Sequence, residues 1–219
     1  STQLTALDIE VFSGFSENNL GTPDLVVVGN VVSRGNPEFE AVLDRGLPYI
    51  SGPQWLAEFV LKDRHVLAVA GTHGKTTTTS MLAFILEKAG LKPGYLIGGV
   101  ANGFDCSASL GEGKYFVIEA DEYDSALFDK RAKFIHYRPN TLILNNLEYD
   151  HADIFKSLSE IETQFQYLIR TIPQTGQLIV NAKEENLARV LAKGCWTPII
   201  PFNDTTAWHA KNMTPDGSA

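Results

Sequence analysis

The sequence predicts an α/β protein built around a mostly parallel β-sheet. Short runs of β-branched and aliphatic residues alternate along the chain with segments of helical periodicity, which is the pattern of parallel α/β sheets. Several of these runs are apolar throughout, as expected for strands that are buried on both faces. Hydrophobic residues make up 44% of the 219 residues, which is enough to fill the core that such a sheet requires.

The chain begins with a predicted strand and helix. Residues 25–28 form a continuous apolar run that predicts a buried strand. A helix is expected to follow, because Asn36 is a favourable N-cap and Pro37 suits the first helical position. Gly46 is placed to end that helix.

A second strand and helix lead to a charged break in the chain. Residues 49–50 predict a short strand, and Pro53 opens a helix with four apolar side chains. The sequence Lys62-Asp63-Arg64 then interrupts the apolar pattern. We place a domain boundary there, with an N-terminal domain over residues 1–62 and a central domain over residues 63–219.

The central domain is predicted to alternate strands and helices. After a strand at 66–69, a helix with apolar residues at helical spacing runs to Gly90. Ser159 and Glu162 have the spacing of a capping box and predict the start of a later helix. Another helix is expected at 183–193. Further strands are expected at 95–97, 115–118, 141–144 and 177–180.

The link between the strand at 66–69 and the next helix has the features of a phosphate-binding loop. Glycines allow backbone N–H groups to approach phosphate oxygens, and the helix N-terminus adds partial positive charge. Lys75 supplies a charge for the β- and γ-phosphates, and the Thr76 hydroxyl is a candidate Mg²⁺ ligand. The alternative is a strand–helix turn with an incidental lysine. The predicted ATP-binding residues are Gly71, Thr72, His73, Gly74, Lys75, Thr76 and Thr77.

Two acidic segments follow predicted strands, where open α/β sheets place their ligands. Residues 119–124 follow the strand at 115–118, and residues 146–151 follow the strand at 141–144. Each segment alone is also consistent with a solvated loop. Because both lie at strand ends beside a phosphate loop, they favour a site for Mg²⁺ and ATP.

The segments GTHGKTTT, FVIEADEYDSALFDKRAKFIHYRPNTLILNNLEYDHADIF and VVVGNVVSRGNPE resemble the Mur ligase superfamily. The resemblance implies a Rossmann-like N-terminal part followed by a P-loop central domain. It also implies catalytic roles for Lys75, Glu119 and His151, with Thr76 and Glu119 on one Mg²⁺ and His151 on a second. Asp121, Glu148 and Asp150 are expected to support these ligands rather than to bind metal.

The resemblance further implies an ATP-dependent ligase of peptidoglycan recycling. Its expected partners are UDP-N-acetylmuramate and the peptide L-alanyl-γ-D-glutamyl-meso-diaminopimelate, joined through an acyl phosphate. A member that adds L-alanine is the alternative within the family. An NTPase switch or a non-catalytic nucleotide-binding module is the alternative of another class, although no DxxG segment follows the acidic strand end.

Several polar residues are candidates for contacts with the substrate. Asn30, Ser33 and Arg34 follow the first strand, where they equally suit a helix start, and Asn146 opens the second acidic segment. Between the two acidic segments, Arg131, His136, Tyr137 and Arg138 are candidates to line the site of the muramyl carboxylate, with a polar surface as the alternative.

Charge and composition argue against other classes of protein. The net charge of −8 disfavours a nucleic-acid partner, and no apolar run approaches the roughly 18 residues that span a membrane. The two cysteines, Cys106 and Cys195, have no metal-site spacing. We therefore expect a reduced cytoplasmic protein. The resemblance also leads us to expect a fragment, without the first UDP-binding loop and the C-terminal domain of the family.

Overall fold

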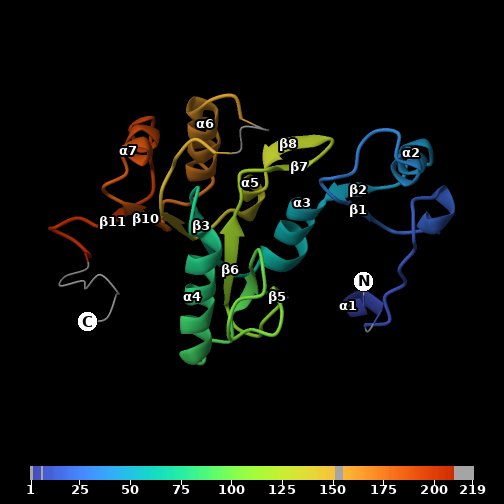
Figure 1. Cartoon of the computed structure of the whole chain (residues 1–219), viewed down its shortest axis with the longest axis horizontal. Helices are drawn as coiled ribbons and strands as arrows, with labels where there is room; N and C mark the ends of the chain where they lie inside the picture. The colour runs from blue at the N-terminus through green and yellow to red at the C-terminus, as the bar shows by residue number, and fades with distance from the viewer. Residues whose placement is uncertain (1, 6, 151–154, 210–219) are drawn as a thin grey trace.

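The computed structural model describes residues 2–5, 7–150 and 155–209, and a seven-stranded sheet forms its centre (Figure 1). The strand order is β11-β10-β9-β3-β6-β4-β5, and every neighbouring pair is parallel except β4 with β5. The expected α/β fold with a mostly parallel sheet is therefore confirmed. The strands are β3 (His65–Ala70), β4 (Gly94–Leu96), β5 (Ala108–Ser109), β6 (Tyr115–Ala120), β9 (Thr141–Leu144), β10 (Gln177–Asn181) and β11 (Ile199–Phe202).

Helices cover both faces of this sheet, with α4 on one side and α6 and α7 on the other (Figure 1). Alternate residues of a strand point to opposite faces, so neighbours in the chain join different cores. Val117 packs in the cluster beneath α4, whereas Ile118 packs with the cluster that includes Phe165 of α6. The helices here are α4 (Lys75–Lys88), α5 (Phe134–Tyr137), α6 (Leu158–Ile169) and α7 (Glu185–Ala192).

The N-terminal part has a small parallel sheet of its own, with β1 (Val26–Val28) beside β2 (Tyr49–Ser51). The helix α2 (Pro37–Asp44) covers it, and Asn36 caps that helix by accepting hydrogen bonds from the N–H groups of Glu38 and Phe39 at 3.0 and 3.2 Å. The predicted cap is confirmed. The other elements are α1 (Thr2–Thr5), a 3₁₀ helix η1 (Glu17–Leu20), α3 (Gly52–Leu56) and a short π-helix η2 (Ala57–Leu61).

A β-hairpin joins the N-terminal part to the central sheet. Its strands are β7 (Asp124–Ala126) and β8 (Asp129–Ala132), and the turn between them carries Phe128. The Phe128 ring lies 6.1 Å from the Phe39 ring and 4.8 Å from the Tyr49 ring, measured between centroids. The hairpin therefore anchors the end of β6 to the N-terminal part.

The predicted capping box at Ser159 and Glu162 is wrong. The helix α6 begins after Ser157, and Glu160 accepts a hydrogen bond from the Lys156 N–H at 2.9 Å. Ser157 and Glu160 have the same spacing as the predicted pair, so the segment contains two overlapping frames of one pattern.

Glu162 is buried and links α6 to α7. Its carboxylate accepts hydrogen bonds from Arg189 at 3.0 Å and from Lys193 at 3.1 Å. Burial acts to raise the pKa of Glu162, but the hydrogen bonds from the two cations outweigh it and hold the pKa below its usual value.

Within the described ranges, no helix combines the length and the apolar character that crossing a bilayer requires.

Candidate functional site

The loop between β3 and α4 lies at the carboxyl edge of the central sheet, and two glycines shape it. Gly71 has φ +150°, and a Cβ there would lie 3.1 Å from both the Asn145 Cβ and the Asn146 carbonyl oxygen. Gly74 is left-handed, with φ +79°, and directly precedes Lys75, the first residue of α4. The N-terminal N–H groups of this 14-residue helix are therefore next to the loop, as in sites that bind phosphate.

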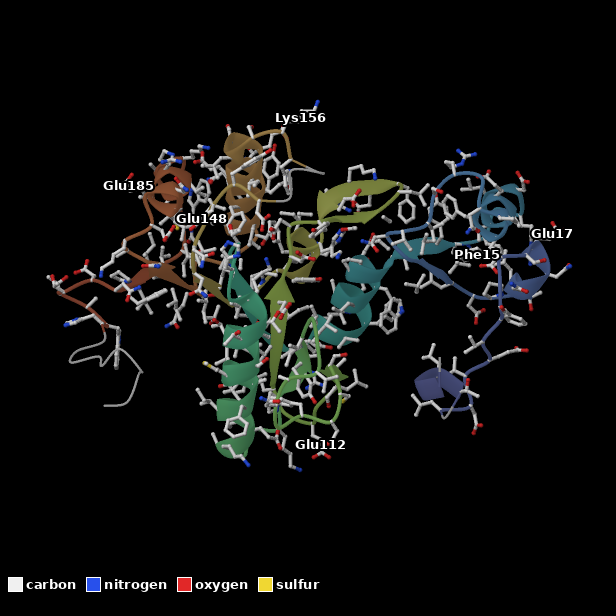
Figure 2. The ribbon with its side chains drawn as sticks, viewed as in Figure 1. Phe15, Glu17, Glu112, Glu148, Lys156 and Glu185 are labelled. Carbon is white, nitrogen blue, oxygen red and sulfur yellow. The ribbon has the colours of Figure 1, made fainter. Side chains whose placement is uncertain are left out.

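The segment after β9 holds this loop in place. The Asn146 side chain accepts a hydrogen bond from the His73 N–H at 2.8 Å and donates one to the His73 carbonyl at 3.1 Å. The Thr72 hydroxyl accepts a hydrogen bond from the Glu148 N–H at 2.8 Å. Figure 2 shows Glu148 beside the N-terminal end of α4, and Glu112 at the opposite end. The substrate role expected for Asn146 stays a prediction, and its contacts are with the loop itself.

Lys75 is mostly buried and its ammonium group lies among loop carbonyls. The Nζ atom donates hydrogen bonds to the carbonyls of Gly71 at 2.7 Å and Thr72 at 3.3 Å. It also lies 3.5 Å from the Oε2 atom of Glu122, whose side chain is only 3% exposed. Sequence reasoning placed Glu122 in the acidic segment without singling it out, because only the fold brings it to Lys75.

Glu119 lies at the end of β6, opposite Val69 of β3 in the sheet register. Its Oε1 atom is buried and has no hydrogen-bond partner among the residues that the structure describes. Its Oε2 atom lies close to Gly98, because a Cβ added at Gly98 would be only 2.7 Å from it. A buried carboxylate oxygen without a donor suits a hard cation such as Mg²⁺, because burying such a group is costly unless it is paired.

The side chains at this edge do not by themselves enclose a metal. Within the described part of the chain, no group of three or more His, Cys, Asp or Glu side chains could hold an ion. Mg²⁺ commonly takes one or two protein carboxylates and completes its coordination with waters and substrate phosphates. The Glu119 carboxylate fits that pattern, whereas His151 lies outside the described residues.

A pocket of about 510 Å³ opens between the N-terminal part and the end of β6. Asn30 lines it from the loop after β1, and Glu119 and Asp121 line it from the central sheet. Lys133 and Tyr137 line it on the side of α5, and Ser125 lines it from the hairpin. Burial, reinforced by the charge of Asp121, raises the pKa of Tyr137, so the phenol stays protonated at neutral pH.

The other candidate substrate residues lie elsewhere. Ser33 is exposed, and Arg34 forms a two-pronged ion pair with Glu40 at 2.9 Å for both contacts, at the start of α2. Their substrate role stays a prediction.

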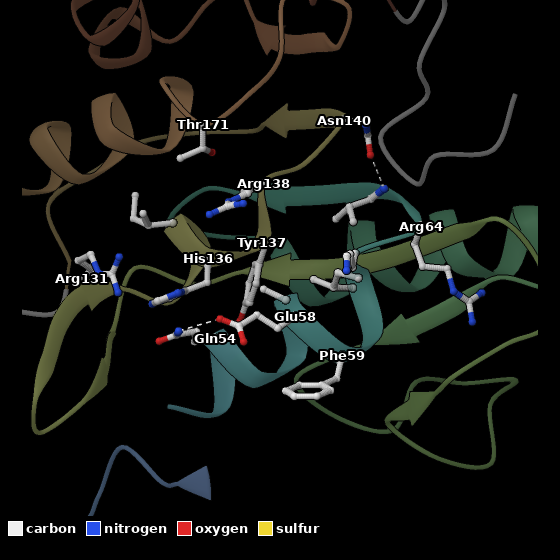
Figure 3. A pocket seen from close by; sticks show the side chains of 15 residues that line it. Gln54, Glu58, Phe59, Arg64, Arg131, His136, Tyr137, Arg138, Asn140 and Thr171 are labelled. Carbon is white, nitrogen blue, oxygen red and sulfur yellow. Dashed lines mark hydrogen bonds between the residues drawn. The ribbon is translucent and has the colours of Figure 1, made fainter. Parts of the chain in front are cut away.

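Arg131, His136 and Arg138 line a different cavity, of about 780 Å³, that also reaches Val66 at the start of β3 (Figure 3). This cavity lies at the edge of the sheet opposite the phosphate loop. Arg131 and His136 both contact the Asp129 carboxylate, at 2.8 and 2.9 Å. Tyr137 reaches both cavities, so of this group only Tyr137 lies at the pocket that contains Glu119.

The fold and the loop together define the class of this protein, an α/β protein with a P-loop at the carboxyl edge of a parallel sheet. Two family models match its sequence. The model described as "Mur ligase family, catalytic domain" matches residues 1–64, and the model described as "Mur ligase middle domain" matches residues 69–216. The chain belongs to the Mur ligase family.

Similar proteins include two kinds of ligase. The chain is 54% identical, over its whole length, to the UDP-N-acetylmuramate–L-alanyl-γ-D-glutamyl-meso-2,6-diaminoheptandioate ligase of Escherichia coli strain K12, and covers 48% of that protein. It is 35% identical over 86% of its length to the UDP-N-acetylmuramate–L-alanine ligase of Geotalea uraniireducens, of which it covers 40%. The chain thus spans about half the length of the curated relatives it matches.

One solved structure resembles this chain over nearly its whole length. The UDP-N-acetylmuramate:L-alanyl-γ-D-glutamyl-meso-diaminopimelate ligase from Neisseria meningitides superimposes with a TM-score of 0.94 at 54% identity. The match covers 99% of this chain and 70% of that one.

Proposed function

We propose that this chain provides the ATP site and part of the sugar site of a ligase. The ligase joins the lactyl carboxylate of UDP-N-acetylmuramate to the amine of L-alanyl-γ-D-glutamyl-meso-diaminopimelate. The observation that carries the proposal is the meeting, at one sheet edge, of the loop at Gly71–Thr77 and a buried Glu119 carboxylate oxygen that has no hydrogen-bond partner within the described part of the chain. The relatives at 54% identity, whose names state this activity, support it.

In this proposal Lys75 and the first turn of α4 bind the phosphates of ATP. The loop amides and the lysine ammonium supply positive charge where the β- and γ-phosphates lie. Thr76 and Glu119 are the residues that would hold Mg²⁺, and His151 would hold a second ion, as the resemblance implies. The metal, when bound, supplies charge that neutralises phosphate oxygens.

The chemistry is an acyl activation followed by amide formation. A lactyl carboxylate oxygen attacks the γ-phosphorus of ATP and ADP leaves, which yields an acyl phosphate. The peptide amine then attacks the acyl carbon, loses a proton, and phosphate departs. Because charge develops mainly on phosphoryl oxygens, the chain contributes by positioning the reactants and by electrostatic stabilisation.

We further infer that residues 1–62 belong to the UDP-sugar domain and residues 63–219 to the ATP domain. The family models meet close to this boundary, at residues 64 and 69. Asn30 lies where the N-terminal part faces the pocket beside Glu119. This position supports Asn30 as a residue that contacts the sugar. The cytoplasm, which holds both ATP and the UDP-sugar, is the proposed location.

Two measurements test the proposal. First, the chain should bind ADP in a Mg²⁺-dependent manner, and Glu119→Gln should raise the Mg²⁺ concentration needed. Second, a chimera in which this chain replaces the matched 48% of the Escherichia coli relative should form product with the tripeptide. Product is identified by mass spectrometry, with L-alanine as the competing amine.

The outcomes separate the candidate functions. Product with L-alanine and none with the tripeptide would favour the other branch of the family. ADP release by the chimera without UDP-N-acetylmuramate or amine would favour an NTPase and contradict ligation. Binding of ADP that is indifferent to Mg²⁺ would contradict the roles of Thr76 and Glu119.

A further inference from the structure

The pocket beside Glu119 has an uneven distribution of charge. Glu119 and Asp121 both line it, and Lys133 is the one cationic side chain among the described residues that do so. A ligand that brings its own carboxylate into this pocket meets two like charges, which repel it in a partly desolvated site. Lys133 is therefore the protein group here that favours such a ligand.

The fold holds Lys133 firmly at this position. It follows β8, and its backbone N–H donates to the Tyr123 carbonyl at 2.8 Å. Its Nζ atom donates to the Asp121 carboxylate at 3.2 Å and lies 5.4 Å from the centre of the Tyr123 ring. The side chain is 24% exposed, so most of its stem is buried.

The ammonium group retains donors for a ligand. A lysine has three N–H donors, and Asp121 accepts one of them. Because Asp121 and the Tyr123 ring orient the group before a ligand arrives, little side-chain freedom is lost on binding. An ammonium group that is held in place, faces a pocket and retains spare donors is suited to bind an anion.

We propose that Lys133 binds the carboxylate of the sugar substrate and holds it toward Glu119 and the phosphate loop. This inference rests on the proposed function, because it takes UDP-N-acetylmuramate as the ligand. It adds a residue to which the sequence analysis assigned no role. The competing interpretation is that Lys133 only ties β8 to the end of β6 through Asp121.

The test compares two ligands that differ in the carboxylate. UDP-N-acetylmuramate carries the lactyl group, and UDP-N-acetylglucosamine is the same nucleotide sugar without it. Because this chain forms only part of the proposed sugar site, binding of each is measured by calorimetry on the chimera with the Escherichia coli relative, for the parent, for Lys133→Met and for Lys133→Arg. Lys130→Met is the matched control, because Lys130 lies in the same hairpin, is well exposed and pairs with Asp124 at 2.6 Å instead.

We expect Lys133→Met to weaken binding of UDP-N-acetylmuramate by about ten- to a hundredfold, the usual effect of losing a hydrogen bond between charged groups. Binding of UDP-N-acetylglucosamine should stay unchanged. Lys133→Arg should restore part of the difference, because it keeps the charge but not the geometry. Lys130→Met should bind both ligands as the parent does.

Other outcomes overturn the inference in distinguishable ways. If the parent prefers UDP-N-acetylmuramate and Lys133→Met keeps that preference, Lys133 has a structural role only and the proposed function survives. If Lys133→Met weakens the binding of both ligands equally, Lys133 likewise has a structural role only. If the parent binds neither ligand, the proposed sugar substrate fails and the inference fails with it.

Discussion

Replacing Gly98 with alanine should impair metal-dependent nucleotide binding while leaving the fold intact. A Cβ at this position would lie 2.7 Å from the Glu119 Oε2 atom, 3.4 Å from its Cδ atom and 3.6 Å from its Oε1 atom. Ordinary van der Waals contact begins at 3.4 Å, so the carboxylate must move by about 0.7 Å or rotate. The methyl group thus displaces the one carboxylate that we assign to Mg²⁺.

The cost to stability should be close to zero. The obstructing atom is the end of a flexible side chain, and an off-rotamer adjustment costs about 0.5–1.5 kcal/mol. The backbone of Gly98 is outside the left-handed region, so alanine can adopt its conformation. Alanine should then add about 0.4–1 kcal/mol to the free energy of unfolding, because it lowers the conformational entropy of the unfolded chain. Moving a metal ligand is more serious, since changes around such ligands typically lower metal affinity by about 10–100-fold.

The assay is a Mg²⁺ titration of ADP binding, with thermal unfolding measured on the same samples. Gly99→Ala is the matched control, because a Cβ there meets nothing within 4 Å and the backbone is again permissive. We expect the Mg²⁺ midpoint to rise at least about tenfold in Gly98→Ala and to stay at the parent value in Gly99→Ala. Equal midpoints in the two folded variants would refute the assignment of Glu119 to the metal.

Three further predictions concern side-chain contacts within the fold. Lys75→Met should abolish ADP binding and destabilise the fold by about 2–3 kcal/mol, because it removes the cation beside the buried Glu122 carboxylate. Adding Glu122→Gln should restore stability in a denaturant titration but not binding, and restored binding would contradict the role of Lys75. Phe128→Ala removes two aromatic contacts with the N-terminal part and should cost about 1–3 kcal/mol in urea unfolding, whereas an unchanged midpoint would contradict the anchor. The pKa of Glu162 is lowered in the folded state from 4.5, so its stabilising effect is complete above pH 4.5 and is lost as pH falls through the folded pKa. Glu162→Gln should therefore be less stable than the parent at pH 7, and its free energy of unfolding should fall less steeply as the pH is lowered. If the free energies of unfolding of the parent and the variant fall equally steeply in acid, Glu162 does not account for this pH dependence.

Local sequence determined most of the regular elements. The strand at 141–144 was predicted to the residue, and Asn36 caps its helix as expected, because apolar runs and capping side chains act within a few residues. The short elements β5, β7, β8, α5 and β11 have too few residues to show a period, and none was predicted. At α6, the spacing of a capping box occurs in two overlapping frames, and neither forms the box, because Ser157 makes no side-chain cap hydrogen bond and Glu160 accepts from the Lys156 N–H.

The sequence by itself also determined the phosphate loop, because glycine spacing and a lysine at a helix start specify that chemistry locally. Only the tertiary structure decided what surrounds it. Glu122 pairs with Lys75, the Asn146 side chain hydrogen-bonds the backbone of the loop, and Lys133, which follows a hairpin that no pattern predicted, lines the same pocket as Glu119. Each of these arrangements brings together residues that lie at the ends of different strands, so it depends on strand order and register. A linear pattern carries no record of that order, so the charge balance of the site became evident only in the folded chain.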